Sequence, residues 1–244
     1  QKIYVVWVAW TFISTMLWAF FFLLWGKLMS RKKALVYSDS ILRMWSQFWG
    51  FLIAIRYRQT GWKPEYGQTP MVLVTNHNSF LDTPVSYVNI RAPFRTLAKR
   101  ELLKVPIMGF IFKTSGIMVD RSSPESRKAS FQRMVEAVNL GESLMIYPEG
   151  TQNRTNEQMQ PFFDGAFKLA VATQVPILPV VTINTRRIMP QAKFGKIRPG
   201  VLSQHFMEPI STVGLQEVDV AALVERVRAA MIAKQIELDP KYPN

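Results

Sequence analysis

The sequence predicts an α/β protein with a mostly parallel sheet flanked by helices, preceded by an N-terminal two-helix segment that associates with a membrane. Two observations predict this class. From residue 71 onwards, short apolar runs typical of strands alternate with helical segments, which indicates a mostly parallel sheet with helices on both faces. Before that region, residues 3–25 carry no charged side chain. We therefore expect membrane-embedded helices in residues 1–58 and one α/β domain in residues 59–244.

The uncharged stretch is long enough to cross a bilayer, and it would also fit within one leaflet. As a helix at ~1.5 Å per residue it covers ~30 Å of hydrocarbon. It is too long for the core of a signal peptide, and no small-residue cleavage site follows it. Residues 41–55 form a second predicted helix, with apolar side chains at helical spacing, that is too short to span. We expect this second helix at the membrane interface, with packing on the protein's own core as the alternative.

Positive charge concentrates beside the uncharged stretch. The net charge of +13 indicates an anionic partner, which is nucleic acid, acidic lipid or a phosphorylated substrate. Residues 1–60 contain eight basic residues and one acid, and Lys27, Arg31, Lys32 and Lys33 follow the uncharged stretch directly. This placement favours an anionic membrane surface over nucleic acid, and the positive-inside rule puts the active site on the cytoplasmic side of the inner membrane. A solvated basic turn between two helices is the alternative.

Residue counts exclude several chemistries. The chain has no cysteine, so it forms no disulfide and has no thiol nucleophile. Its two histidines, His77 and His205, are too few for a multi-histidine metal site. Most metal and thiol chemistries are thereby excluded, and we expect no bound cofactor.

Hydrophobic periodicity and turn signals predict the elements of the α/β domain. Strands are predicted at residues 71–75, 94–98, 116–119, 144–147, 177–183 and 201–206. Helices are predicted at residues 82–90, 106–112, 124–138, 163–172 and 217–235. The third of these helices has the clearest start, because Ser123 suits the N-cap and Pro124 the first helical position. Prolines in VPILPV, residues 175–180, restrict pairing where the fifth strand begins.

The first strand of this domain leads into NHNSFLD, residues 76–82. Reactive residues gather at the carboxyl ends of strands in an open α/β sheet. His77 follows the strand and Asp82 begins the next helix, so the carboxylate is expected to hold one ring nitrogen and leave the other free to take a proton from a hydroxyl. His77 is thus a candidate general base, with a structural loop histidine as the alternative. Ser79 is expected to cap the helix.

Three further strand ends carry side chains that are suited to anionic groups. YPEGTQNR, residues 147–154, follows a strand, and its glycine, its turn amides and Thr151 are suited to anionic oxygens. Glu149 is expected to anchor this turn or to orient a hydroxyl. Arg121 follows another strand, and its guanidinium is suited to phosphate, with an exposed surface arginine as the alternative. Lys99 adds a cation after a third strand.

Four sequence blocks, in this order, resemble the glycerolipid acyltransferase family, which includes bacterial 1-acyl-sn-glycerol-3-phosphate acyltransferases. NHNSFLD is similar to the family's HX4D signature, and GIMVDR (116–121) to its glycine-to-arginine block. YPEGTQ (147–152) is similar to its P-E-G-T-R block, and VPILPV to its fourth block. The resemblance covers about residues 70–185. One block alone would be weak, whereas four in the same order are specific.

The resemblance implies a reaction as well as a fold. It implies direct transfer of a fatty acyl group from a thioester of coenzyme A or acyl carrier protein to the free sn-2 hydroxyl of lysophosphatidic acid, without a metal or an acyl-enzyme. His77 would be the base and Asp82 its partner. The membrane helices that family members carry agree with residues 3–55. The residues implied to hold the acceptor are Lys99, Arg121, Glu149, Gly150 and Thr151, and we add Arg154 as a candidate because it follows the same turn.

Gln152 departs from the family pattern, which has an arginine at this position. Losing that cation weakens the inference of a phosphomonoester on the acceptor, although Arg154 lies two residues away. Another lyso-lipid, either a lysophospholipid or a lyso-aminolipid, is the alternative acceptor. Two other classes of protein remain: a metal-assisted hydrolase using His77, Asp82 and Glu149, and a non-catalytic basic protein that binds a membrane or nucleic acid by charge alone.

Overall fold

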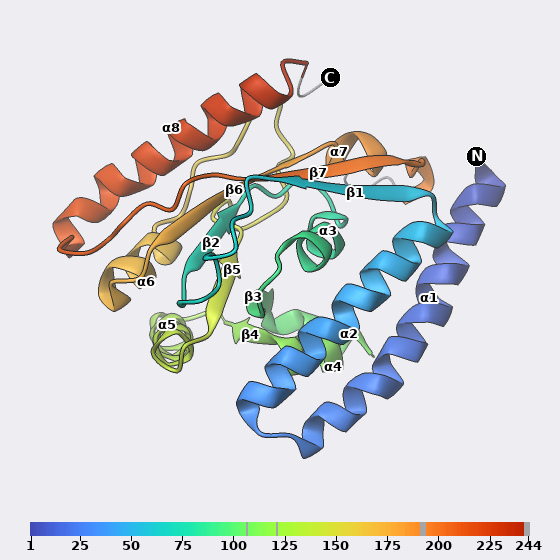
Figure 1. The fold of residues 1–244 in the computed structure, drawn as a ribbon, viewed down its shortest axis with the longest axis horizontal. Coiled ribbons are helices and arrows are strands. Elements are labelled where there is room, and N and C mark those ends of the chain that lie inside the picture. The colour runs from blue at the N-terminus through green and yellow to red at the C-terminus, as the bar shows by residue number, and fades with distance from the viewer. Residues whose placement is uncertain (106, 121, 191–193, 242–244) are drawn as a thin grey trace.

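One sheet of seven strands lies at the centre of the part of the chain that the computed structural model describes, namely residues 1–105, 107–120, 122–190 and 194–241 (Figure 1). The strand order is β1-β7-β6-β2-β5-β3-β4, and within the described residues only β6 and β7 pair antiparallel. The strands are β1 Ile55–Thr60, β2 Val72–Thr75, β3 Phe94–Lys99, β4 Gly116–Val119, β5 Ser143–Ile146, β6 Ile177–Ile183 and β7 Gly200–Phe206. The predicted mostly parallel sheet is confirmed.

Helices cover both faces of the sheet (Figure 1). One face carries α1 Lys2–Trp25, α2 Arg31–Leu52, α3 Asp82–Asn89 and α4 Met108–Ser115, and the other carries α5 Pro124–Asn139, α6 Gly165–Thr173 and α8 Val220–Leu238. The short helix α7 Thr185–Ile188 and the 3-10 turns η1 Gly26–Leu28, η2 Arg100–Lys104, η3 Phe194–Lys196 and η4 Glu217–Asp219 connect these elements. Because strand residues alternate in direction, Leu73 of β2 packs in the first core while Val72 and Val74 pack in the second.

The predicted helices of the α/β domain lie within a few residues of the observed ones. The start of α5 is as expected, because the Ser126 N–H donates to Ser123 Oγ at 3.1 Å and Pro124 takes the first helical position. The helix predicted from residue 106 begins at Met108, and Pro106 itself lies outside the described residues.

The two N-terminal helices form an antiparallel hairpin (Figure 1). The second helix differs from its prediction, because α2 begins at Arg31 and not at residue 41. Ser30, with an extended backbone at φ −62° and ψ 154°, occupies the N-cap position, and the following lysine and arginine side chains are good helix formers. The helix ends at Leu52, since Ala54 adopts a left-handed conformation at φ 53° that no helix continues through.

Strand β1 was not predicted from the sequence. Its residues, IRYRQT, alternate between more buried and more exposed positions. Because most of them are polar, the sequence shows no apolar run that would indicate a strand. Residue 55, expected to end the second helix, begins this edge strand, which pairs in parallel with β7. The boundary expected after residue 58 therefore falls inside β1.

Both helices of the hairpin pack on the α/β domain and on each other. Trp45 and Trp49 stack with ring centroids 5.5 Å apart, and the Trp45 indole N–H donates to Thr15 Oγ1 on α1 at 3.0 Å. The basic cluster beside α1 is partly used within the molecule, since Arg31 pairs with Glu142 at 3.0 Å and the Lys27 ammonium lies 4.9 Å from the Phe110 ring centroid. Thus α2 packs on the protein's own core, as the alternative interpretation held, while its other face stays exposed.

Candidate active site

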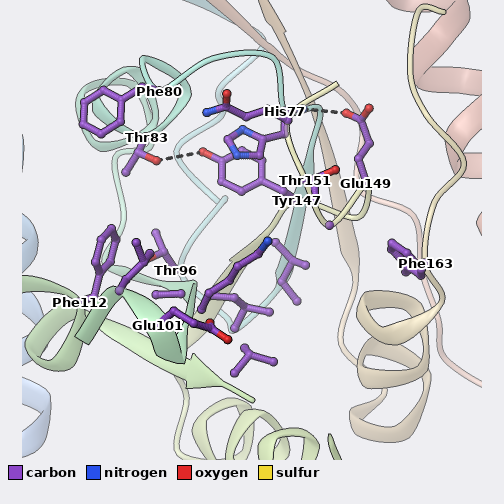
Figure 2. Close-up of a pocket in the computed structure, with 18 of the residues that line it drawn as sticks. His77, Phe80, Thr83, Thr96, Glu101, Phe112, Tyr147, Glu149, Thr151 and Phe163 are labelled. Atoms are coloured by element: carbon purple, nitrogen blue, oxygen red, sulfur yellow. Dashed lines mark hydrogen bonds between the residues drawn. The ribbon is translucent and has the colours of Figure 1, made fainter. Parts of the chain in front are cut away.

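The carboxyl ends of β2, β3, β4 and β5 surround a cavity of about 960 Å³ (Figure 2). The loops that follow β2 and β5 form its upper wall, and η2 and α4 form much of the lower wall. This is the edge of the sheet at which the sequence predicts the candidate site. The cavity is large enough for a small-molecule ligand with an extended apolar portion.

His77 and Asp82 are in direct contact. The His77 ring Nδ1 lies 2.8 Å from Asp82 Oδ2, and the Asp82 side chain is almost fully buried, at 1% exposure. An ionised carboxylate only accepts hydrogen bonds, so the ring donates through Nδ1 and Nε2 is left as the basic nitrogen. His77 retains 19% exposure and lines the cavity. The predicted pair is therefore formed, and its free nitrogen belongs to a side chain on the cavity wall.

Asp82 also shapes the loop that carries His77. Its Oδ2 accepts from the Asn78 N–H at 2.6 Å and from the Ser79 N–H at 2.8 Å. These bonds satisfy backbone donors that precede α3, which is the role expected for the Ser79 side chain. Ser79 Oγ accepts from another N–H of this loop, that of Leu81, and donates to the Met189 carbonyl. Ser79 is not the N-cap of the helix as expected, because α3 begins at Asp82 and Leu81 takes the N-cap position.

Tyr147 packs flat against the imidazole, a contact that sequence reasoning missed. The two ring centroids are 4.0 Å apart at an interplanar angle of 19°, and Figure 2 shows the rings one above the other. The Tyr147 hydroxyl lies 3.4 Å from Thr83 Oγ1, and burial raises the pKa of this phenol well above its usual range. Stacking and the Asp82 bond together hold the ring of His77 in one orientation.

Glu149 connects the two loops of the site. Its Oε1 accepts from the His77 N–H and its Oε2 from the Gln160 N–H, both at 2.8 Å. The Asn153 N–H donates to the His77 carbonyl at 2.6 Å, so both backbone groups of the histidine are held by the loop after β5. Burial raises the pKa of Glu149 to about 7, against the opposing effect of these hydrogen bonds. Of the two roles expected for Glu149, the turn anchor is the one these contacts match.

The other predicted site residues divide into two groups. Lys99, Gly150 and Thr151 line the cavity, and Gly150 adopts φ 70°, a conformation that favours glycine at this turn. Arg154 is exposed on the same loop and is not among the cavity-lining residues. Arg121 lies outside the described residues.

Apolar side chains form the rest of the cavity wall. They come from several elements and include Phe80, Leu97, Leu102, Met108, Phe112 and Phe162. No motif marked them, because an apolar residue that lines a cavity has the same sequence pattern as one in a packed core. The site thus combines a polar end at His77 with apolar walls.

Within the described ranges, no three His, Asp or Glu side chains are grouped in a way that could hold a metal ion. Glu149, which the hydrolase alternative needs as a ligand, has each of its two oxygens occupied by a backbone N–H. His77 likewise has Nδ1 committed to Asp82.

The fold and the site define an α/β protein that carries a His–Asp pair on the HX4D spacing at the carboxyl edge of its sheet. Residues 55–183 match the family described as Acyltransferase, and the chain belongs to this acyltransferase family. The resemblance noted in the sequence is thereby confirmed.

Curated relatives carry a common name. The chain is 36% identical over 175 residues to human 1-acyl-sn-glycerol-3-phosphate acyltransferase beta, covering 66% of this chain and 58% of the relative. It is 33% identical over 177 residues to the Saccharomyces cerevisiae 1-acyl-sn-glycerol-3-phosphate acyltransferase, covering 70% and 58%. The chain thus spans little more than half the length of these two relatives.

The crystal structure of the 1-acyl-sn-glycerophosphate acyltransferase PlsC from Thermotoga maritima has the same fold. The TM-score is 0.79 at 22% sequence identity, and the match covers 100% of this chain and 96% of that one. The match extends through the N-terminal hairpin as well as the α/β domain.

Proposed function

We propose that the protein transfers a fatty acyl group from an acyl thioester, either acyl-CoA or acyl carrier protein, to the sn-2 hydroxyl of lysophosphatidic acid, which gives phosphatidic acid. The observation that carries the proposal is the 2.8 Å contact between His77 Nδ1 and Asp82 Oδ2 on the wall of a mainly apolar cavity. The names of the human and yeast relatives support the choice of acceptor.

In this reaction His77 is the general base. As the acceptor oxygen attacks the thioester carbonyl carbon, its proton moves to His77 Nε2 and an oxyanion forms. The oxyanion then collapses, the carbon–sulfur bond breaks, and the leaving thiolate takes the proton back from the ring. Atoms and charge balance without a metal, a bound cofactor or an acyl-enzyme. Asp82 keeps the ring in the tautomer that presents Nε2 and stabilises the imidazolium.

Lys99 and the turn Glu149–Thr151 line the same cavity as His77, which supports a role in binding the acceptor headgroup. We assign Lys99 and the Gly150 and Thr151 backbone to the headgroup, with Arg121 and Arg154 as further cations. Gln152 also lines the cavity. Because it replaces a cation, a lysophospholipid or lyso-aminolipid acceptor is the second candidate.

The acceptor would reach the site from a membrane that the hairpin binds. The stretch Lys2–Leu28 is long and apolar enough to span a bilayer, and 22% of its most apolar window is buried within the protein. Exposed basic side chains such as Lys32 and Lys33 suit an anionic leaflet. We propose the cytoplasmic face of the inner membrane as the location and membrane lipids as partners, with no role for nucleic acid.

A thiol-release assay on the purified full chain tests the proposal. Acyl-CoA and acyl carrier protein donors are each combined with lysophosphatidic acid, a lysophospholipid and a lyso-aminolipid, with and without chelator. We expect chelator-resistant release with lysophosphatidic acid, and a loss of about 10²- to 10⁴-fold in the folded His77→Ala variant. A Gln152→Arg variant in the same panel reports on headgroup choice.

Two outcomes would contradict the proposal. No thiol release with any acceptor would favour a non-catalytic basic membrane-binding protein. Near-normal release by His77→Ala would remove the general base from the mechanism.

A further inference from the structure

The last helix of the chain holds the loop that follows β5. On α8, the partly buried Arg228 donates through Nε to the Gln160 carbonyl at 3.1 Å and through Nη2 to the Met159 carbonyl at 2.8 Å. A guanidinium fork bonded to two successive carbonyls fixes the direction of the chain between them. Arg228 lies outside residues 55–183, the region that matches the family.

From this loop, hydrogen bonds continue to the histidine. The Gln160 N–H donates to Glu149 Oε2, and Glu149 Oε1 accepts from the His77 N–H. We propose that Arg228 is a positioning residue for His77, acting through the peptide between Met159 and Gln160 and through the Glu149 carboxylate. This inference rests on the proposed function for its catalytic consequence.

Peptide geometry makes the connection direct. The Met159 carbonyl and the Gln160 N–H belong to one planar, trans peptide unit, so they point in opposite directions. Arg228 binds the carbonyl end of this plane while Glu149 accepts from the N–H end. Holding the carbonyl therefore sets the direction of the N–H. If the carbonyl is released, the plane is free to rotate, and Glu149 loses one of the two donors that orient it.

The surroundings of the loop limit other paths of influence. The Met159 side chain is fully buried in the core under α6 and α8, and Gln160 to Phe163 line the cavity. Arg228 itself does not line the cavity. Both hydrogen bonds that it makes within the described residues go to this loop, so we expect a change in turnover after its substitution to act through the loop.

The pKa of Glu149 gives the proposal a test based on the pH dependence of the rate. Burial raises its pKa to about 7, the His77 and Gln160 N–H groups lower it, and the two side chains whose charges act on it are His77 and Asp82. Loss of the Gln160 N–H removes a lowering contribution, so the pKa rises further. Protonated Glu149 is a weaker acceptor for the His77 N–H, so the acid limb of the pH–rate profile moves to higher pH.

Steady-state kinetics on the full chain, in the thiol-release assay, tests the proposal. We expect Arg228→Ala to lower kcat by about 10- to 100-fold with KM values little changed, and to move the acid limb to higher pH. Arg228→Lys, which keeps a donor without the fork, should restore part of kcat. Arg226→Ala, an exposed arginine on the same helix, removes the same charge and should behave as wild type. A folded Arg228→Ala variant with the kcat and pH profile of Arg226→Ala would overturn the proposal.

A double-mutant cycle tests the path through Glu149, and hydrogen exchange tests the connection without relying on the reaction assigned. If Arg228 acts through Glu149, the losses in Arg228→Ala and Glu149→Gln will not multiply in the double variant, whereas independent effects would. Faster exchange of the His77 and Gln160 amides in Arg228→Ala than in Arg226→Ala would support the connection even if the wild type released no thiol, a result that would refute only the proposed function. Unchanged exchange of both amides would refute the connection itself.

Discussion

At the scale of single residues, Asp82 combines two tasks. One oxygen, Oδ2, accepts from the His77 ring and from two backbone N–H groups of the loop between β2 and α3. The backbone donors hold the carboxylate in place, and the carboxylate in turn fixes the orientation of the His77 ring. The five-residue spacing of His77 and Asp82 follows from this arrangement, because it is the spacing at which a loop folds back onto the first turn of the helix it precedes.

Glu149 makes stability depend on pH in an unusual direction. Its pKa is raised from 4.5 to about 7, so the folded protein keeps a proton that the unfolded chain has already released. Its contribution is therefore present below the unfolded pKa and is lost as pH rises through about 7, a change on the order of 3 kcal/mol. We expect the Tm of the wild type to fall across this window. Glu149→Gln should show a flatter curve, whatever its overall stability.

Comparing how steeply Tm changes with pH in the wild type and in Glu149→Gln separates the effect of Glu149 from that of other titratable groups. Asp39, whose pKa burial raises to about 6, contributes with the same sign over a lower part of the window. It is present in both proteins, so its effect cancels in the difference between the two curves. Parallel curves for the wild type and Glu149→Gln would show that Glu149 is not the group responsible.

At the scale of elements, the sequence predicted what is local and missed what depends on distant partners. The strand ends at residues 76–82 and 147–154 were found because each carries its signal within one short segment. The Tyr147 ring against His77 and the Arg228 fork on the loop join segments about seventy residues apart, and no periodicity names such a partner. Strand β1 was missed because its edge position allows arginine at alternate residues.

An ion-pair cluster joins the hairpin to the sheet. Glu142, immediately before β5, accepts from Arg95 on β3 at 2.7 and 2.9 Å and from Arg31 at the start of α2 at 3.0 and 3.1 Å. Burial alone would raise the pKa of Glu142, but the bonds from Arg95 and Arg31 outweigh it and the pKa is lowered. The cluster therefore ties three elements that are far apart in the sequence.

The ion pairs of the two arginines are expected to contribute differently to the free energy of unfolding. Arg95 is 10% exposed in its side chain and Arg31 47%. Glu142→Ala leaves a buried arginine unpaired, which should cost about 3–5 kcal/mol of unfolding free energy. Arg31→Ala breaks the two ion pairs of a half-exposed arginine, to Glu142 and Glu136, and leaves Glu142 bonded to Arg95, which should cost about 0–1 kcal/mol. Thermal unfolding in a mild detergent measures both, with the exposed Lys32→Ala as control. Equal losses for Glu142→Ala and Arg31→Ala would contradict this ranking.

At the scale of the whole molecule, apolar surface is concentrated on the hairpin. Its members are exposed by 40% or more and come from α1, η1 and α2: Ile3, Val6, Trp7, Trp10, Ile13, Leu17, Trp18, Phe21, Phe22, Trp25, Leu28, Val36, Met44, Phe48 and Phe51. Other exposed apolar residues, such as Val213 and Val218, lie near η4 beside the start of α8, away from the hairpin (Figure 1). So many exposed apolar side chains on two adjacent helices indicate an interaction surface, which we call the hairpin face.

If the hairpin face binds lipid, polar substitutions there will weaken partitioning into vesicles without altering the cavity. Trp10, Phe21 and Trp25 are each exposed by more than 60%, so serine at all three should preserve the fold and lower partitioning by at least about 10-fold. Val218→Ser, at a position that is 85% exposed near the start of α8, should bind as wild type. Co-sedimentation with vesicles measures partitioning, and thiol release with a short-chain, water-soluble acceptor measures the site. The triple variant should lose the first and keep the second. Wild-type partitioning by the triple variant would contradict membrane contact through this part of the hairpin face, because the loss of three large exposed aromatic rings removes much of the apolar surface there.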